Sequence, residues 1–276
     1  MTVLMTAAIP SDQDLLALAL RLCRETADII NVIRARGFVT QKKYDQSPVT
    51  EADQEAERHI LSALRAAVPG IPAIGEEEIA AGIKIAPGAQ YWLVDPLDGT
   101  REFAAGRDDF TVNIGLVRGD RAVLGAMALP AYGQFYAGGE GLGAKRFDAD
   151  GEHDIRARHV PPEGLTILAS RHHGDAPELA RFLEGRPVAS LGNIGSAVKF
   201  VRVAEGAADF YPRLGPTMEW DTAAPQAIVE AAGGCVLEFD GSPLRYGKPE
   251  WRNPNFVCTG LPDNTHPDKR ISPAGT

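Results

Sequence analysis

The chain has 276 residues, of which 44% are hydrophobic and 24% are charged, and its net charge is -9. This composition is typical of a globular protein with a substantial core, and no repeat is visible. The acidic balance argues against sequence-independent binding to long nucleic acid, where a basic surface supplies most of the affinity. A small anionic substrate stays open, because bound divalent cations can reverse the local charge.

The cysteines and the first residues bear on the cellular compartment. Cys23, Cys235 and Cys258 have no paired spacing, which argues against a disulfide framework or a zinc site. The first ten residues lack the basic region of a secretory leader, and no apolar stretch has membrane-spanning length. We therefore expect a cytoplasmic protein without a transmembrane segment. A peripheral contact with the inner membrane, and the choice between monomer and homodimer, stay open.

Amphipathic patterns predict two helices at the start of the chain. Ser11 can cap a helix that ends near Gly37, and Thr50 can cap a second one that ends at residues 69–70. Short apolar runs then predict five strands, at residues 71–75, 91–95, 111–117, 122–129 and 134–137. We expect this half, about residues 11–158, to be α+β with a largely antiparallel sheet.

From about residue 160 the order of the predicted elements changes. Strands at 165–170, 208–211 and 235–239 alternate with helices at 177–183, 196–204 and 222–232. This alternation is typical of an α/β arrangement, expected here over residues 159–260. The Pro-rich polar tail at 261–276 is expected to be mobile. Since few linker-like residues separate the halves, we predict a single domain over residues 1–276.

The strongest local signal is the segment DPLDGT at residues 95–100, which follows an apolar strand. Pro96 stiffens the turn, so several oxygen atoms could face one hard cation. These oxygens belong to Asp95, Asp98 and the Leu97 carbonyl. Gly99 and Thr100 would begin a helical turn whose N–H groups can bind phosphate. An isolated segment of this kind is explained equally well by an Asx turn that closes the strand.

Three further acidic positions matter if they converge on this turn. They are Glu76 in the GEEE run at 75–78, Asp221 at the start of a predicted helix, and Asp53. Each also has a plain structural explanation: a solvated charge run, a helix N-cap, and the third residue of a Thr50 capping box. The residues alone leave both explanations open.

Together these motifs resemble the lithium-sensitive, magnesium-dependent phosphatases of the inositol monophosphatase superfamily, over about residues 15–258. The markers follow the family's order: GEE at 75–77, DPLDGT at 95–100 and WDTAA at 220–224. The resemblance implies that the domain is catalytic and is a sugar-phosphatase-like sandwich with layers in the order α-β-α-β-α. It also implies two or three Mg²⁺ ions in the site and inhibition by Li⁺.

The resemblance further implies a role for each acid. The implied metal ligands are oxygen atoms: Glu76, Asp95 and the Leu97 carbonyl for one metal, and Asp95, Asp98 and Asp221 for a second. The implied catalytic residues are Asp53, Thr100 and Glu76. Among them, Asp53 and Thr100 would orient and deprotonate the attacking water, and two metals would stabilise the attacking and the leaving oxygen.

Within the superfamily the likeness is to the bacterial CysQ-type 3′(2′),5′-bisphosphate nucleotidases. It rests on residues 47–50, on 98–103 leading to 110–114, and on 211–217. Enzymes resembling true inositol monophosphatases place a glutamate seven residues before the Trp-Asp aspartate, where this chain has Leu214. The resemblance therefore implies that the chain hydrolyses the 3′-phosphate of adenosine 3′,5′-bisphosphate to give AMP and phosphate, with a role in sulfur assimilation.

A bisphosphorylated nucleotide needs a second anion site, away from the metals. Gly195 and Ser196 could supply donors at a helix start, with Lys199 on the same helix face. Arg213 could bind phosphate and Tyr211 could face adenine. The candidate phosphate and substrate residues are Gly99, Thr100, Gly195, Ser196, Lys199, Tyr211, Arg213 and, at the substrate edge, His173. For Lys199 and Arg213 the alternative is ordinary surface charge.

Several alternatives stay open beside this hypothesis. The substrate could instead be 3′-phosphoadenosine 5′-phosphosulfate (PAPS), an inositol phosphate or fructose 1,6-bisphosphate. A function of a different class is a non-catalytic, metal-dependent binding protein. The segment at 139–144 matches a dinucleotide-binding pattern, but no amphipathic helix follows it, so a glycine-rich hairpin is favoured.

Overall fold

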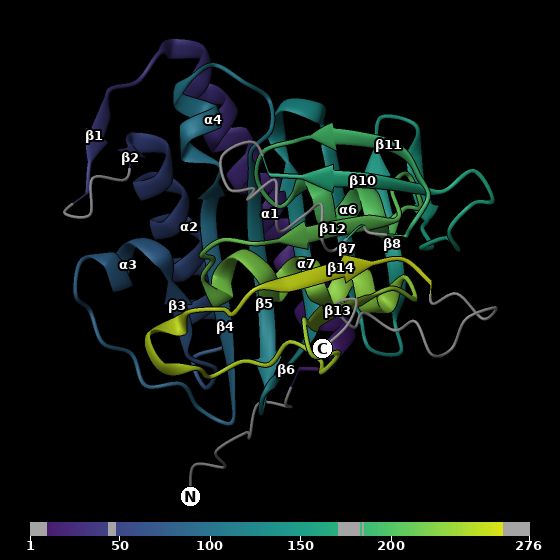
Figure 1. The fold of residues 1–276 in the computed structure, drawn as a ribbon. Helices are drawn as coiled ribbons and strands as arrows, with labels where there is room; N and C mark the ends of the chain where they lie inside the picture. Colours follow the sequence, from purple (N-terminus) through teal and green to yellow (C-terminus); the bar gives the residue numbers. More distant parts are fainter. Residues whose placement is uncertain (1–9, 44–47, 171–182, 184, 262–276) are drawn as a thin grey trace, which may run out of the picture.

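The computed structural model describes residues 10–43, 48–170, 183 and 185–261 (Figure 1). Its first two long helices are α1 (Asp12–Arg36) and α2 (Glu51–Ala67). Ser11 and Thr50 cap them as predicted, because each side chain accepts a hydrogen bond from a backbone N–H of the first turn. Each helix buries one apolar face, which includes Leu22 and Ile30 in α1 and Ile60 in α2.

A seven-stranded sheet forms the first half, in the order β3-β4-β5-β6-β7-β8-β9. Its strands are β3 (Ala73–Gly75), β4 (Gln90–Asp98), β5 (Thr111–Arg118), β6 (Arg121–Leu129), β7 (Gln134–Gly139), β8 (Gly143–Asp148) and β9 (Gly151–Asp154). Only β3 and β4 pair in parallel, which confirms the prediction of a largely antiparallel sheet. The β7–β8 hairpin spans the glycine-rich segment, as predicted. Strand β9 was not predicted.

The second half contains a mixed sheet in the order β11-β10-β12-β14-β13. Its strands are β10 (Leu165–Ala169), β11 (Val188–Asn193), β12 (Phe210–Arg213), β13 (Cys235–Glu238) and β14 (Phe256–Thr259). Strand β10 pairs in parallel with β11 and β12, whereas β14 is antiparallel to β12 and β13. The predicted α/β character of this half is confirmed. Strand β11 was not predicted from the sequence, and its residues are mostly exposed.

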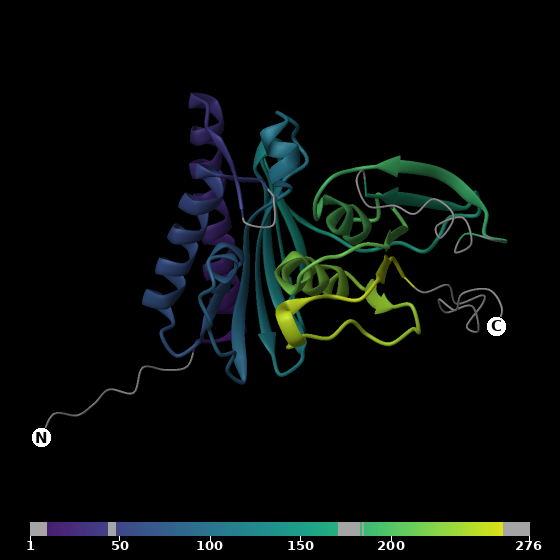
Figure 2. The same ribbon diagram turned by 60° about the vertical axis from the view of Figure 1, so that its left-hand side comes forward.

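The helices and sheets are stacked in layers (Figure 2). Helices α1 and α2 cover one face of the seven-stranded sheet, and α6 (Val198–Ala204) and α7 (Glu219–Ala231) lie between the two sheets. A Cβ on Gly115 would lie 2.5 Å from the Ala224 nitrogen, so small residues let α7 pack directly on the sheet. The described residues contain four of the five predicted layers. The helix predicted at 177–183 lies almost entirely outside them.

Several short elements complete the described chain. They are β1 (Thr40–Lys42), β2 (Pro48–Thr50), α3 (Glu76–Ala80), α4 (Thr100–Ala104), η1 (Pro130–Tyr132) and η2 (Pro249–Trp251). No helix among the described residues is long and apolar enough to cross a membrane. The tail from residue 262 lies outside the described residues, and the single catalytic domain over residues 1–276 stays a prediction.

Two predicted helix boundaries were wrong. Helix α6 begins at Val198, two residues later than predicted, because Ser196 has a positive φ of 49° and cannot join the helix. Helix α7 begins at Glu219, three residues earlier than predicted. Asp221 therefore lies inside the first turn of α7 and is not its N-cap.

Candidate active site

A bulge in β4 brings Asp95 and Asp98 to the same face of the sheet. Asp95 pairs with Asn113 of β5 and Asp98 with Thr111, so β4 has one residue more than β5 between the two pairs. Pro96 lies in this interval and has no N–H for the ladder. Two residues three apart in a regular strand point to opposite faces, and the extra residue removes that difference.

Thr100 connects this turn to α2. Its hydroxyl lies 2.9 Å from Asp53 Oδ1 and 3.1 Å from the Leu97 carbonyl oxygen, and its one hydrogen can be donated to either. The other oxygen of Asp53 accepts hydrogen bonds from the N–H and the hydroxyl of Thr50, both at 2.7 Å. Asp53 thus completes the capping box and also contacts Thr100, so the two explanations of this residue are compatible.

Three acids from separate elements bring their carboxylate oxygens together. Glu76 is the first residue of α3, Asp95 lies in β4 and Asp221 lies in the first turn of α7. One oxygen from each lies within 4.8 Å of the other two. Asp221 is held by the Met218 N–H, which donates to its Oδ2 at 2.8 Å. Far-separated positions of the chain therefore meet, as the motifs predicted.

The electrostatics of this acidic group fit a divalent cation. Asp95 is 1% exposed, and its Oδ2 has no hydrogen-bond partner within the described part of the chain. Burial and the neighbouring charges, first that of Glu76, raise the pKa of Asp95 well above its usual range. Burial also raises the pKa of Asp221, and it raises that of Asp98 to about 6. Mg²⁺ prefers oxygen ligands, so an unpartnered buried carboxylate oxygen among other acids suits it.

A cavity of about 250 Å³ adjoins the acidic group, between the two halves of the molecule. The predicted site residues that line it are Glu76, Asp98, Gly99, Thr100, Gly195, Ser196, Lys199, Tyr211, Arg213 and Asp221. Three other predicted site residues, Asp53, Asp95 and Leu97, do not line the cavity, but each lies next to a residue that does. His173 lies outside the described residues. The structure therefore brings together every predicted site residue that it describes.

Lys199 is a core residue, so the alternative of ordinary surface charge was wrong for it. It is 1% exposed, and its Nζ donates to the carbonyl oxygens of Ile194, at 2.9 Å, and Ser196. The ammonium lies 4.9 Å from the centre of the Tyr211 ring, which is itself 3% exposed. Burial lowers the pKa of Lys199 to about 7.

The backbone N–H groups around Ser196 already have protein partners. Gly195 donates to Asp109 Oδ2 at 3.5 Å, and Ala197 donates to Asp98 Oδ2. The predicted placement of Ser196 and Lys199 on one helix face was wrong, because Ser196 precedes α6. The segment instead ties Asp98 of the first sheet to the second half of the molecule.

Arg213 lines the cavity while its guanidinium is bound to its own surroundings. Nε and Nη2 donate to the carbonyl oxygens of Gly215 and Pro216, at 3.2 and 2.7 Å. Nη1 donates to the Ser170 hydroxyl at 3.2 Å. A guanidinium has five N–H donors, so these three bonds orient it and leave two for a substrate.

Sequence reasoning missed the partners of the GEEE run. Lys43 Nζ lies 2.6 Å from a carboxylate oxygen of Glu76 and 2.6 Å from one of Glu77. Arg65 forms an ion pair with Glu78 at 2.6 Å. The run is therefore not a solvated charge run, because each of its acids has a cationic partner. The signal that could have found Lys43 is its place just before the 47–50 motif.

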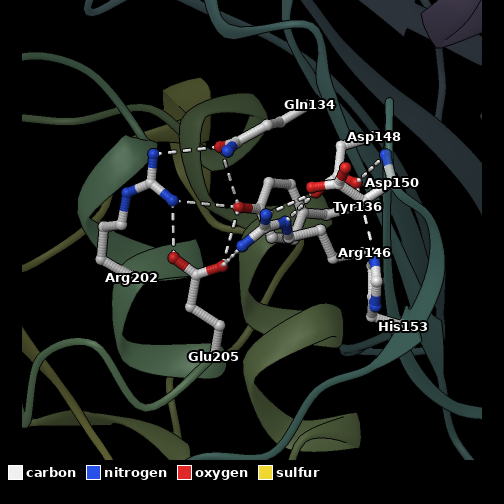
Figure 3. Close-up of polar contacts among 8 residues, drawn as sticks. All are labelled: Gln134, Tyr136, Arg146, Asp148, Asp150, His153, Arg202 and Glu205. Carbon is white, nitrogen blue, oxygen red and sulfur yellow. Dashed lines mark hydrogen bonds and ion pairs between the residues drawn. The ribbon is translucent and has the colours of Figure 1, made fainter.

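A second polar cluster lies away from the cavity, on β7, β8, β9, the turn between β8 and β9, and the end of α6 (Figure 3). Its members are Gln134, Tyr136, Arg146, Asp148, Asp150, His153, Arg202 and Glu205. Glu205 accepts hydrogen bonds from Arg202 at 2.5 Å and from the Tyr136 hydroxyl at 2.9 Å. Arg146 lies between two acids, 3.4 Å from Glu205 and 2.6 Å from Asp148. In this cluster, named here the paired cluster, acids and bases face each other.

Comparison with known proteins agrees with this arrangement. The chain is 39% identical over 242 residues to the 3′(2′),5′-bisphosphate nucleotidase CysQ of Salmonella typhimurium, covering 87% of this chain and 97% of that protein. It is 40% identical over 215 residues to the CysQ nucleotidase of Escherichia coli K12, covering 78% of this chain and 86% of that one.

Among solved structures, CysQ from Bacteroides thetaiotaomicron, a bacterial member of the inositol monophosphatase family, matches with a TM-score of 0.76. The sequence identity is 30%, and the match covers 91% of this chain and 99% of that chain. Residues 11–268 also match the inositol monophosphatase family as a whole, which confirms the resemblance drawn from the motifs. The chain belongs to the inositol monophosphatase family.

Proposed function

We propose that this chain is a magnesium-dependent phosphatase that converts adenosine 3′,5′-bisphosphate and water to AMP and phosphate. Its CysQ relatives carry the name 3′(2′),5′-bisphosphate nucleotidase and cover most of the chain. The observation that carries the proposal is the meeting of Glu76, Asp95 and Asp221 at one end of a cavity. A cytoplasmic location and a role in sulfur assimilation belong to the same proposal.

The acidic group would hold the metal ions. Glu76, Asp95 and the Leu97 carbonyl form one ligand set, and Asp95, Asp98 and Asp221 form the other. When bound, Mg²⁺ supplies positive charge that stabilises the attacking and leaving oxygens of the phosphoryl group. The buried and unpartnered Oδ2 of Asp95 supports this assignment, because it offers a free lone pair to a cation.

Asp53 and Thr100 would prepare the attacking water. The Thr100 hydroxyl lies between Asp53 Oδ1 and the Leu97 carbonyl, so donation to either leaves its lone pairs free to accept from the water. Burial raises the pKa of Asp53, which makes this carboxylate a better proton acceptor. When the Thr100 hydroxyl donates to Asp53, the attacking water gives a proton to Thr100 as Thr100 gives its own proton to Asp53. The water oxygen bonds to phosphorus while the bond between phosphorus and the 3′-oxygen breaks, and the leaving 3′-oxygen takes a proton from solvent water to become the 3′-hydroxyl of AMP.

The rest of the cavity would recognise the nucleotide. Ser196, Lys199 and Arg213 line the same cavity as Thr100 and can bind the second phosphate. Lys199 would act as a buried positive charge, since its Nζ already donates to two carbonyl oxygens. Leu214 stands where a polyol phosphatase has a glutamate, which favours a nucleotide over an inositol phosphate.

Kinetics on a panel of phosphates test the proposal. Purified protein with Mg²⁺ should hydrolyse adenosine 3′,5′-bisphosphate with a higher kcat/KM than PAPS, inositol 1-phosphate or fructose 1,6-bisphosphate, and EDTA should abolish turnover. Faster hydrolysis of inositol 1-phosphate would refute the proposal that adenosine 3′,5′-bisphosphate is the substrate. Absence of turnover on every phosphate would favour a non-catalytic binding protein.

Two further measurements test what the family resemblance leads us to expect. LiCl at tens of millimolar should inhibit the hydrolysis. Light scattering would distinguish a monomer from a homodimer.

A further inference from the structure

Helix α2 presents a polar stripe to the turn that carries Glu76. Asp53, Glu57 and Arg65 share one face, because they are separated by four and eight residues. Asp53 contacts Thr100, and Arg65 pairs with Glu78 and donates to the Ala73 carbonyl at 3.1 Å. The stripe therefore runs from the catalytic side of the site to the strand that precedes Glu76.

Glu57, in the middle of this stripe, binds the backbone of the turn with both carboxylate oxygens. Oε2 accepts from the N–H of Glu77 and Oε1 from the N–H of Glu78, each at 2.7 Å. The residue is 4% exposed. A Cβ on Gly75 would lie 2.4 Å from Oε2, so only glycine lets the carboxylate come this close. The fit between Glu57 and residues 75–78 is therefore tight on both sides.

Burying this acid costs free energy, which its two hydrogen bonds from backbone N–H groups partly offset. Glu57 lies beside the charges of Glu78 and Glu76, and burial raises its pKa to about 7. Its two hydrogen bonds go to consecutive backbone N–H groups, which fixes the direction of the chain directly after Glu76. A side chain that binds consecutive N–H groups limits rotation of the segment, and so it limits where Glu76 can point.

We propose that Glu57 is a positioning residue that aims the Glu76 carboxylate at Asp95 and Asp221 and thereby sets the affinity of the site for Mg²⁺. This inference rests on the proposed function, in which Glu76 is a metal ligand. Residues that orient metal ligands commonly change metal affinity by about 10–100-fold when they are replaced.

Two variants separate position from charge. Glu57→Gln removes the charge and leaves one backbone N–H without an acceptor, because an amide has a single oxygen. Gly75→Ala keeps the Glu57 charge and displaces the carboxylate by steric contact. Glu55→Gln is the matched control, since Glu55 lies on the same helix and is 37% exposed beside Arg58.

Calorimetric titration of each purified protein with Mg²⁺, without substrate, measures the effect independently of turnover. Circular dichroism in EDTA verifies that each variant is folded. Both Glu57→Gln and Gly75→Ala should raise the Mg²⁺ dissociation constant about 10-fold or more, while Glu55→Gln should leave it within about twofold. If Glu57→Gln does not fold, Gly75→Ala decides alone.

The outcomes distinguish this inference from the proposed function. A wild-type chain that binds no Mg²⁺ would refute the proposed function itself. A wild-type chain that binds Mg²⁺ no more tightly than Gly75→Ala would overturn the positioning role and leave the proposed function standing. The positioning role would also be overturned if Glu57→Gln bound Mg²⁺ more weakly while Gly75→Ala bound it as the wild type does. The charge of Glu57, and not its position, would then explain the affinity.

Discussion

The acidic group at the cavity and the paired cluster of Figure 3 both include residues of the seven-stranded sheet but match their charges differently. In the paired cluster, Glu205 and Asp148 face Arg202 and Arg146. At the cavity the carboxylates face one another, and burial with mutual repulsion raises the pKa values of Asp95 and Asp221.

The two patterns of charge indicate different roles for the two clusters. Matched charges satisfy one another and stabilise the fold, whereas buried unmatched charges cost stability unless another ion joins them. Lys43 forms an ion pair with Glu76, but this single cation does not balance the three carboxylates of Glu76, Asp95 and Asp221. The acidic group is therefore built for added positive charge, and the paired cluster is not.

Removing one acid from each cluster should affect catalysis very differently, and this is the largest effect that we expect. Asp98→Asn should lower kcat about 100- to 1,000-fold, because it removes a proposed metal ligand that stabilises the transition state. Glu205→Gln should leave kcat within about twofold. Steady-state kinetics at saturating Mg²⁺ measure both. Equal losses in the two variants would show that the clusters do not divide function from stability.

Magnesium should stabilise the folded chain through the acidic group alone. At about 100 times its dissociation constant, Mg²⁺ should raise the free energy of unfolding by about 2.7 kcal/mol. Thermal unfolding with Mg²⁺ and with EDTA measures this increase. The increase should persist in Glu205→Gln and shrink in Asp98→Asn, and an unchanged increase in Asp98→Asn would contradict the assignment.

Glu205→Gln should lower the free energy of unfolding by about 2 kcal/mol, because Arg202 and Tyr136 lose a charged acceptor. Urea unfolding in EDTA measures the loss. In the same buffer, Asp98→Asn should lower the free energy of unfolding by less than this, or raise it, because the substitution relieves repulsion among the acids. A larger loss in Asp98→Asn would mean that the acidic group stabilises the metal-free fold.

The stability of the metal-free chain should depend on pH through Asp98 of the acidic group. Burial raises the pKa of Asp98 to about 6, above its unfolded value of about 3.9. The metal-free wild type therefore loses stability relative to Asp98→Asn as pH rises from about 4 to about 6, by up to about 1.4 kcal/mol per pH unit. Below about pH 4 the ionisation of Asp98 contributes least to the difference in stability between the wild type and Asp98→Asn. Urea unfolding in EDTA across the window tests the sign.

Local patterns in the sequence predicted many of the helices and strands and the chemical type of the site. Amphipathic patterns, together with the capping residues Ser11 and Thr50, predicted the two long helices. Apolar runs predicted most strands of the first sheet. These signals are local, so they can be read along the chain. The ordered motifs around Glu76, Asp95 and Asp221 named the acids that the fold brings together.

How these acids meet, and what holds them in place, depends on contacts between segments that are far apart in the sequence. The β4 bulge turns Asp95 and Asp98 to one face, and Glu57 and Lys43 reach the Glu76 turn from distant parts of the chain. Lys199 is likewise buried, with its ammonium beside the Tyr211 ring. Such contacts join residues far apart in sequence, and their energies depend on burial and distance, which no local pattern records.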